Sequence, residues 1–257
     1  MLNVEASAQA VKGQEKHLSW AWRSKVASSK IRFGLAEIQA LRQAGDDPMP
    51  RKAEQTPAKE GGAWQWGRTA QTRRVLLDAA REIFCEQGFT EASVAAVVRR
   101  AGSSVGSLYH HFGGKAELFV AVWEDYESTR ERNAADAVAR AREAGESDPL
   151  ELFLVGTRSF LEDCWRRRDL VRLWMDGDAP PAFTLMRRAR GREWIRQNAI
   201  LLKAGDAPAD RLVVSLMTTI TGEAGREIAA CSRKRDADAL ADTTIALIRR
   251  LDPLSIR

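Results

Sequence analysis

The chain has 257 residues, of which 44% are hydrophobic and 29% charged, the proportions of a soluble globular protein with length for one or two domains. Its formal net charge of +5 permits a nucleic-acid partner without requiring one. No apolar run approaches the ~20 residues that a membrane span needs, and the N-terminus lacks a secretory pattern. We therefore expect a cytoplasmic protein with no membrane partner.

The three cysteines are widely separated, odd in number and form no CxxC pair (Cys85, Cys164 and Cys231). They predict neither a disulfide framework nor a zinc site, which suits a reducing compartment. His110 and His111 are adjacent, so on a helix their side chains point about 100° apart and cannot share a metal in the usual i, i+4 manner. The sequence therefore predicts no metal and no cofactor.

Residues 1–67 differ from the rest of the chain. The stretch 46–67 is rich in Pro, Gly, Lys, Glu and Gln, a composition that cannot bury enough apolar surface to order itself. We expect a largely disordered N-terminal extension over 1–67, in which the basic residues Arg51, Lys52 and Lys59 either reach DNA or are solvated surface charges. Met49 is a plausible natural start, so two interpretations of residues 1–48 stay open: native segment, or over-extended gene model.

From Thr69 onward, apolar residues recur at helical spacing and no strand pattern is present. The first helix is marked by residues that recur at helical spacing, namely Leu76, Ala80, Ile83, Phe84 and Gln87. It should stop at Gly88, which suits a left-handed cap, and Phe89 should fold back on its last turn.

Two short helices should follow. Ser93 is a good N-cap for the first, with Val94, Val97 and Val98 facing inward and Gly102 ending it. Either Ser103 or Ser104 can cap the second, which should reach about His110 before Gly113 and Gly114 break it. A longer helix should then run from Lys115 to about Ala144.

The remainder predicts further helices over 148–167, 169–175, 181–203, 208–231 and 236–251, separated by Gly and Pro. The fold class is therefore all-α, with about nine helices.

The segment 93–112 carries the functional signal. Two short helices joined by a tight turn at Gly102 cross steeply, so that the second can enter a DNA major groove while the first braces it. Val98, Ala101, Leu108 and Phe112 would fill the small core that fixes this angle. Gly106 inside the second helix costs ~1 kcal/mol relative to Ala, which makes sense if DNA must approach closely there.

Residues 72–123 closely resemble the DNA-binding domain of the TetR (tetracycline-repressor-like) family. The residues that carry the resemblance are Ala79-Ala80, Phe84, Gly88-Phe89, Ala101-Gly102, the run from Gly106 to Phe112, and Lys115 to Leu118. The resemblance implies an N-terminal three-helix helix-turn-helix domain over 68–115. A helical ligand-binding and dimerisation domain over 116–257 would follow.

By position, the resemblance implies that Tyr109 and Lys115 contact phosphates and that Ser93 caps its helix against the DNA backbone. The groove-facing positions and their neighbours complete the expected DNA-binding set: Arg73, Ser93, Ser103, Ser104, Val105, Gly106, Ser107, Tyr109, His110 and Lys115. Two positions depart from the family, which often has an apolar residue at Ser103 and a lysine at Val105. Val105 could touch a thymine methyl. These two departures therefore alter which operator sequence is preferred.

Two apolar stripes on the last helices suggest a homodimer with a four-helix interface, since reading two half-sites needs a rigid dimer. They consist of Leu212, Leu216, Met217, Ile220, Ala224 and Ile228, and of Leu240, Thr244, Leu247, Ile248 and Leu251. The alternative is that the stripes only fill the monomer's core.

Large apolar residues between these regions could line a small-molecule site, or could be ordinary core. The candidate ligand residues are Phe153, Thr157, Trp165, Trp174, Phe183 and Trp194.

The sequence therefore predicts a non-enzymatic, ligand-released transcriptional repressor that binds double-stranded operator DNA. No P-loop, nucleophile elbow or HExxH motif is present. The main alternative is a helical protein-interaction module without DNA binding.

Overall fold

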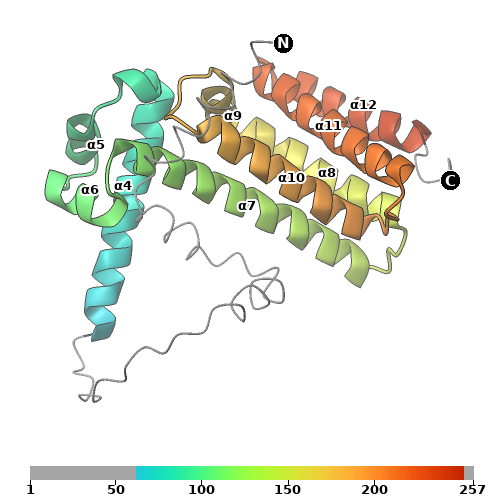
Figure 1. Ribbon diagram of the computed structural model, residues 1–257, viewed down its shortest axis with the longest axis horizontal. Helices are drawn as coiled ribbons and strands as arrows, with labels where there is room; N and C mark the ends of the chain where they lie inside the picture. Colours follow the sequence, from blue (N-terminus) through green and yellow to red (C-terminus); the bar gives the residue numbers. More distant parts are fainter. Residues whose placement is uncertain (1–61, 252–257) are drawn as a thin grey trace, which may run out of the picture. The chain divides into compact units, whose positions relative to one another are not determined.

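The computed structural model describes residues 62–251, and side chains from Thr69 onward. This part of the chain holds nine α-helices and no strand, which confirms the all-α prediction (Figure 1). In chain order they are α4 (Gly62–Glu91), α5 (Val94–Arg100), α6 (Val105–Phe112), α7 (Lys115–Glu143), α8 (Pro149–Arg166), α9 (Arg168–Met175), α10 (Phe183–Leu201), α11 (Pro208–Ala230) and α12 (Lys234–Leu251). Residues 1–61 of the expected disordered extension, Met49 included, lie outside the described residues. Residues 62–67, which were expected to belong to that extension, instead form the start of α4.

Helix α4 continues past the expected stop. Gly88 has the predicted positive φ of 77°, but helical structure resumes beyond it and ends at Glu91. Gln87 is exposed, whereas Leu76, Ala80, Ile83 and Phe84 on the same helix are buried as expected. Phe89 folds back as predicted, with its ring 6.3 Å from that of Phe84. Gly88 therefore interrupts the helix at the predicted position, and residues 89–91 form a short turn beyond this break that leads into α5.

Serine caps begin the next two helices. The Ser93 hydroxyl accepts a hydrogen bond from the Ala96 N–H (3.1 Å), and the Ser104 hydroxyl accepts one from the Ser107 N–H (3.1 Å). Each bond satisfies a backbone donor that the first helical turn leaves free. The structure thus selects Ser104 over Ser103 as the cap of α6. Helix α6 ends at Phe112, slightly later than the expected end near His110, and Gly113 caps it with a φ of 97°.

Helix α7 connects the N-terminal helices α4 to α6 with the helices that follow it. It begins next to α4 and α6 and then packs along α8, which in turn contacts α11 and α12 (Figure 1). The short helix α9 lies between α4 and α11, with α10 packed on α8 and α11. One buried apolar cluster runs from Leu76 in α4 through Phe119 in α7 to Ile228 in α11, and a second lies around Leu202, Val214 and Ile248.

Within residues 62–251, no helix is both long enough and apolar enough to cross a membrane.

Candidate nucleic-acid interface

Helix α6 exposes one face and buries the other. Val105 is 47% exposed and Tyr109 is 53% exposed, whereas Leu108 and Phe112 are buried against the apolar cluster. Val105 and Tyr109 are four residues apart on α6, so their exposed side chains lie on the same face of the helix.

The remaining residues of the predicted set lie around that face. Ser104, Gly106 and His110 are exposed, and Ser103 and Ser107 are half-buried. A Cβ added at Gly106 would meet nothing within 4 Å. No neighbour among the described residues therefore requires a glycine at this position. The close approach of DNA stays the predicted reason for Gly106.

Helix α5 is held to α4 by a pair of ion pairs that sequence reasoning missed. The Arg100 guanidinium donates to Glu82 (2.8 Å) and to Glu86 (3.1 Å), and it holds the pKa of the Glu86 carboxyl below its usual range. These exposed pairs contribute little stability individually, but a fork on two carboxylates restricts the rotation of α5 on α4.

Arg73 lies beside the end of α6. Its guanidinium sits 5.0 Å from the centroid of the Phe112 ring, while the side chain remains exposed. Partial burial, the neighbouring His110 and the Arg73 charge together lower the pKa of His111. A cation at this position adds positive potential next to the exposed face of α6.

Lys115 has a different environment from the one implied by its expected phosphate contact. Its ammonium donates to the carbonyl oxygens of Phe89 (2.8 Å), Thr90 (3.0 Å) and Ala92 (2.9 Å). It also lies 4.6 Å from the centroid of the Phe89 ring. Because an ammonium has three donors, all of them are used within the protein. Lys115 therefore ties the start of α7 to the turn between α4 and α5, and its phosphate contact stays a prediction.

The six candidate ligand residues are distributed over different packing environments, and their contact with a ligand stays a prediction. Trp174 and Phe183 pack together (ring centroids 5.7 Å apart) in the cluster that includes Phe119, but Phe153 belongs to the second cluster. Thr157 is buried on α8. Trp165 lies against Arg168 and Trp194 against Phe160, both half-buried. Helical spacing identified these residues as inward-facing but could not tell which neighbours each would meet.

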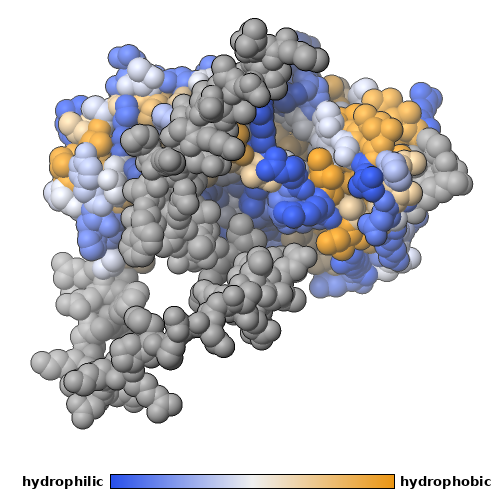
Figure 2. All heavy atoms as spheres, viewed as in Figure 1, coloured by the Kyte–Doolittle hydropathy of each residue, from blue (hydrophilic) through white to orange (hydrophobic). Residues whose placement is uncertain are grey.

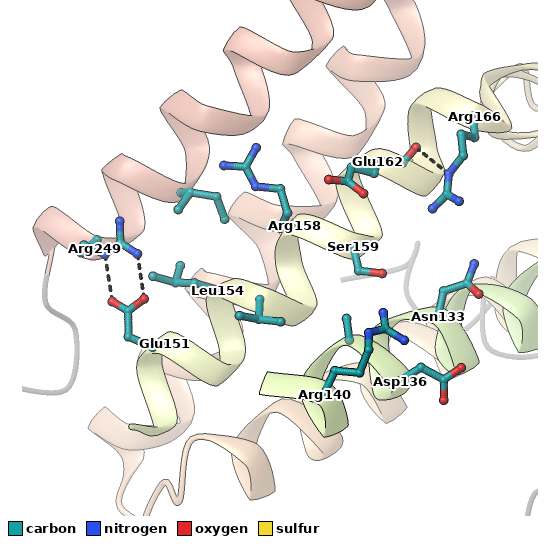
Figure 3. Close-up of a pocket in the computed structure, with 13 residues that line it drawn as sticks. Asn133, Asp136, Arg140, Glu151, Leu154, Arg158, Ser159, Glu162, Arg166 and Arg249 are labelled. Carbon is teal, nitrogen blue, oxygen red and sulfur yellow. Dashed lines mark hydrogen bonds and ion pairs between the residues drawn. The ribbon is translucent and has the colours of Figure 1, made fainter. Parts of the chain in front are cut away.

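A groove in the described part lies elsewhere, between α7, α8 and α12. It measures about 560 Å³ and is lined mainly by arginines and carboxylates, including Arg140, Arg158, Glu162 and the paired Glu151 and Arg249 (Figure 3). None of the six predicted residues borders it. Its lining reads in sequence as ordinary solvated helix surface, so no sequence signal could have found it.

A buried charge cluster joins α7 to α10, and sequence reasoning missed this too. Glu127, which is 5% exposed, accepts a hydrogen bond from Arg130 (2.6 Å) and lies 3.6 Å from the Arg190 Nε. Arg190 also pairs with Glu131 (2.8 Å). The Arg130 guanidinium lies among three aromatic rings, those of Tyr126, Phe160 and Trp194. Charges at i and i+3 on a helix normally indicate a solvated face, which is why this cluster was not expected.

The apolar stripes on the last two helices divide between core and surface. Met217, Ala224, Ile228, Thr244 and Ile248 are buried within the chain itself. Leu212, Leu216, Leu247 and Leu251 are 48–59% exposed. Because α11 and α12 are antiparallel with a short connection, all four leucines lie at the same end of this hairpin. In Figure 2, hydrophobic residues gather over that end of the molecule, at the right of the view.

Two of the three cysteines are poor nucleophiles. Burial is the main cause that raises the pKa of the Cys85 thiol to about 12 and that of the Cys164 thiol to about 11. Both therefore remain protonated at neutral pH. Among the described residues, no group of three or more His, Cys, Asp or Glu side chains is arranged to hold a metal ion.

The geometry of α4 to α7 matches that of known regulators. The family described as "Bacterial regulatory proteins, tetR family" matches residues 76–122. The HTH-type transcriptional regulator UidR of Escherichia coli (strain K12) is 49% identical over 51 residues, which are 20% of this chain and 26% of UidR. The chain thus matches about a quarter of the length of this curated relative.

Solved structures are similar over a longer stretch. A TetR-like transcriptional regulator from Rhodococcus sp. RHA1 is 25% identical, with a TM-score of 0.54, covering 70% of this chain and 95% of that one. NalD, the secondary repressor of the MexAB-OprM multidrug efflux pump in Pseudomonas aeruginosa, has the same fold (20% identity, TM-score 0.53, covering 71% and 96% of the two chains). The chain therefore contains, over residues 76–122, the N-terminal region of the tetR family of bacterial regulatory proteins, and its described helices share the fold of TetR-like regulators.

Proposed function

We propose that this protein is a transcriptional regulator that binds operator DNA as a homodimer and is released from it by a small molecule. The observation that carries the proposal is the exposed face of α6, from Ser104 to His110, on a helix whose other face is fixed in the core. Residues 68–115 would be the DNA-binding domain, and residues 116–257 the ligand-binding and dimerisation domain. No catalytic role is assigned to the chain.

Tyr109 would contact phosphates and so fix the protein on the duplex. Val105, Ser107 and His110 would read base edges, with the Val105 side chain suited to a thymine methyl. Arg73 would add a phosphate contact beside the end of α6, and Ser93 would orient the start of α5 toward the backbone. Together these contacts divide the DNA-binding set into positioning and reading residues.

The effector would act by shifting a conformational equilibrium. Helix α7 supports this idea because it begins at Lys115, which is tied to the turn after α4, and then runs along α8. An effector that separates Trp174 from Phe183 would move α7, because both rings pack on Phe119. The two copies of α6 would then miss the ~34–36 Å spacing of successive major grooves. The effector can shift the equilibrium only by its difference in affinity for the two conformers.

The test is a titration of the purified protein against duplex DNA from directly upstream of its gene, at several salt concentrations, with random duplex as control. We expect sequence-selective binding by two protein chains per site, with an affinity that falls steeply as salt rises. Failure to bind any duplex even at low salt would reject the proposal in favour of a helical protein-interaction module.

Within this proposal, Tyr109→Ala should weaken binding about equally across operator variants, because it removes a phosphate contact. Ser107→Ala and Val105→Ala should instead change which bases are preferred, each by about 1–3 kcal/mol at the affected position. Binding to a set of singly substituted operators measures both effects. Equal, sequence-independent losses from all three variants would contradict this division of roles.

Leu216→Glu should convert the dimer into a monomer, because it introduces a charge into the exposed leucine group at the proposed interface. Sedimentation or light scattering would measure the change, and operator affinity should fall at least ten-fold as half-site cooperation is lost. Leu185→Glu is the matched control, since Leu185 is similarly exposed (55%) but lies on α10. A Leu216→Glu protein that remains dimeric would contradict this choice of interface.

A further inference from the structure

The turn between α4 and α5 is held by a carboxylate from outside the DNA-binding helices. Asp178, in the loop after α9, accepts hydrogen bonds from the Thr90 N–H at 2.9 Å (Oδ2) and 3.1 Å (Oδ1). The Thr90 hydroxyl also donates to Asp178 Oδ1. The two residues are 88 positions apart in the chain, so this contact depends on the tertiary fold and not on local structure.

The backbone of the turn leaves room for this carboxylate. A Cβ at Gly88 would lie 2.5 Å from Asp178 Oδ2, and Gly88 adopts a φ of 77° that side-chain-bearing residues rarely reach. On the other side of the turn, Lys115 binds the carbonyls of Phe89, Thr90 and Ala92. Asp178 therefore takes up the free donors of the turn, and Lys115 takes up its carbonyl acceptors.

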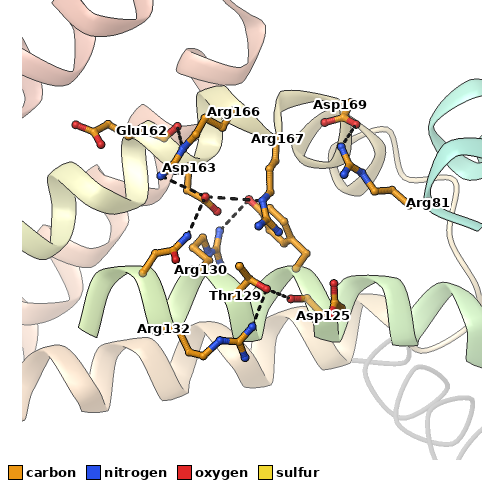
Figure 4. A network of polar contacts seen from close by, with 12 residues as sticks. Arg81, Asp125, Thr129, Arg130, Arg132, Glu162, Asp163, Arg166, Arg167 and Asp169 are labelled. Atoms are coloured by element: carbon orange, nitrogen blue, oxygen red, sulfur yellow. Dashed lines mark hydrogen bonds and ion pairs between the residues drawn. The ribbon is translucent and has the colours of Figure 1, made fainter. Parts of the chain in front are cut away.

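Helix α9, which directly precedes the loop that carries Asp178, also contacts α4 near its start and α11 in its middle. Asp169, near the start of α9, pairs with Arg81 of α4 at 2.9 Å (Figure 4). Arg172, in the middle of α9, donates to the Ala229 carbonyl at the end of α11 (2.8 Å). We call residues 168–178, which include Asp169, Arg172 and Asp178, the α9 strut.

We propose that the α9 strut, acting through Asp178, sets the angle between the DNA-binding helices and the dimerisation helices, and so determines the half-site spacing that the dimer accepts. This inference rests on the proposed function. Helix α11 carries two of the exposed leucines of the proposed dimer interface, and the strut connects α11 to the turn that leads into α5 and α6. Spacing matters because successive half-sites must match the helical repeat of DNA. Asp178 is thus a positioning residue that touches no DNA.

The experiment compares wild type with Asp178→Ala on a series of operators whose centre is shortened or lengthened by one or two base pairs. Wild type should lose about ten-fold in affinity for each base pair of change, whereas Asp178→Ala should lose less than about three-fold or prefer a different spacing. Asp176→Ala is the matched control, because Asp176 is exposed, two residues away and has no hydrogen bond or ion pair through its carboxylate among the described contacts. It should keep the wild-type spacing profile.

Three further readouts separate positioning from simple loss of folding. Binding of Asp178→Ala to a single half-site should equal that of wild type, and thermal unfolding should stay cooperative. Amide hydrogen exchange at Thr90 should become faster in the variant, a result that requires no DNA. A spacing profile identical to wild type would overturn the inference even if operator binding itself is strong. Absence of operator binding by wild type would instead reject the proposed function, and unchanged exchange at Thr90 would then reject the Asp178 contact separately.

Discussion

Replacing Glu127 by alanine should lower the free energy of unfolding by about 3–5 kcal/mol, the largest stability effect that we expect from a single charged residue in this chain. Glu127 is 5% exposed, and its Oε2 accepts from Arg130 and from the Trp194 indole while Arg190 lies close by. Without it, two guanidinium groups whose side chains are only 12% and 13% exposed would lose their shared counter-charge.

The surroundings of Arg130 explain why this cost cannot be avoided by deprotonation. Burial by itself lowers the pKa of the Arg130 guanidinium. The Glu127 carboxylate and other neighbours raise this pKa by more than burial lowers it, so the net shift is upward. The Nε atoms of Arg130 and Arg190 and one oxygen of Glu131 already lack hydrogen-bond partners among the described residues. The cluster therefore already has two unpaired Nε donors for its single free acceptor, the Glu131 oxygen, and that oxygen cannot replace every contact of the Glu127 carboxylate.

Chemical denaturation of wild type and Glu127→Ala measures this effect. Glu82→Ala is the matched control: Glu82 also pairs with an arginine, at 2.8 Å, but its side chain is 56% exposed. Screening by solvent should limit the loss in the control to about 1 kcal/mol or less. Equal losses in the two variants would mean that burial does not determine the contribution of Glu127.

Replacing Lys115 by methionine should lower the free energy of unfolding by about 3 kcal/mol, which corresponds to a fall in Tm of roughly 6–12 °C for a protein of this size. The change removes three charge-assisted hydrogen bonds to the carbonyls of Phe89, Thr90 and Ala92. Methionine keeps the length and apolar stem of the lysine, so the loss reports the ammonium and not the packing. Operator affinity should fall for every sequence, because the turn before α5 loses its support.

This result separates two roles for Lys115. A residue that only contacts phosphate would leave stability unchanged and would reduce the salt dependence of binding by about one counterion. Lys234→Met is the control, since Lys234 pairs with Asp238 in an i, i+4 arrangement at the surface. An unchanged Tm for Lys115→Met, combined with a smaller salt slope, would favour the phosphate contact over the turn support.

Local sequence signals specify the short helices of the candidate nucleic-acid interface. Ser93, Ser104, Gly102 and Gly113 act on backbone groups within a few residues, so their effects hold whatever the rest of the chain does. Helical spacing of apolar residues likewise identified the later helices to within a few positions. At Gly88 the helix breaks with the predicted positive φ, and helical structure resumes for a few residues beyond the break.

Which side chains contact one another depends on how the helices pack in three dimensions. The spacing of apolar residues indicates that one face of a helix is covered, but not which residues cover it. The six candidate ligand residues therefore lie in different packing environments. For the same reason Met217 and Leu216 were assigned to one stripe, although Met217 is buried in the core and Leu216 is exposed. The Lys115 contacts, the Glu127 cluster and the Asp178 bond are polar and span between 3 and 88 residues. In sequence each of these charges looks like an exposed one. Its role depends on desolvation and on the partner that the fold brings within hydrogen-bond distance, and neither is a local property of the chain.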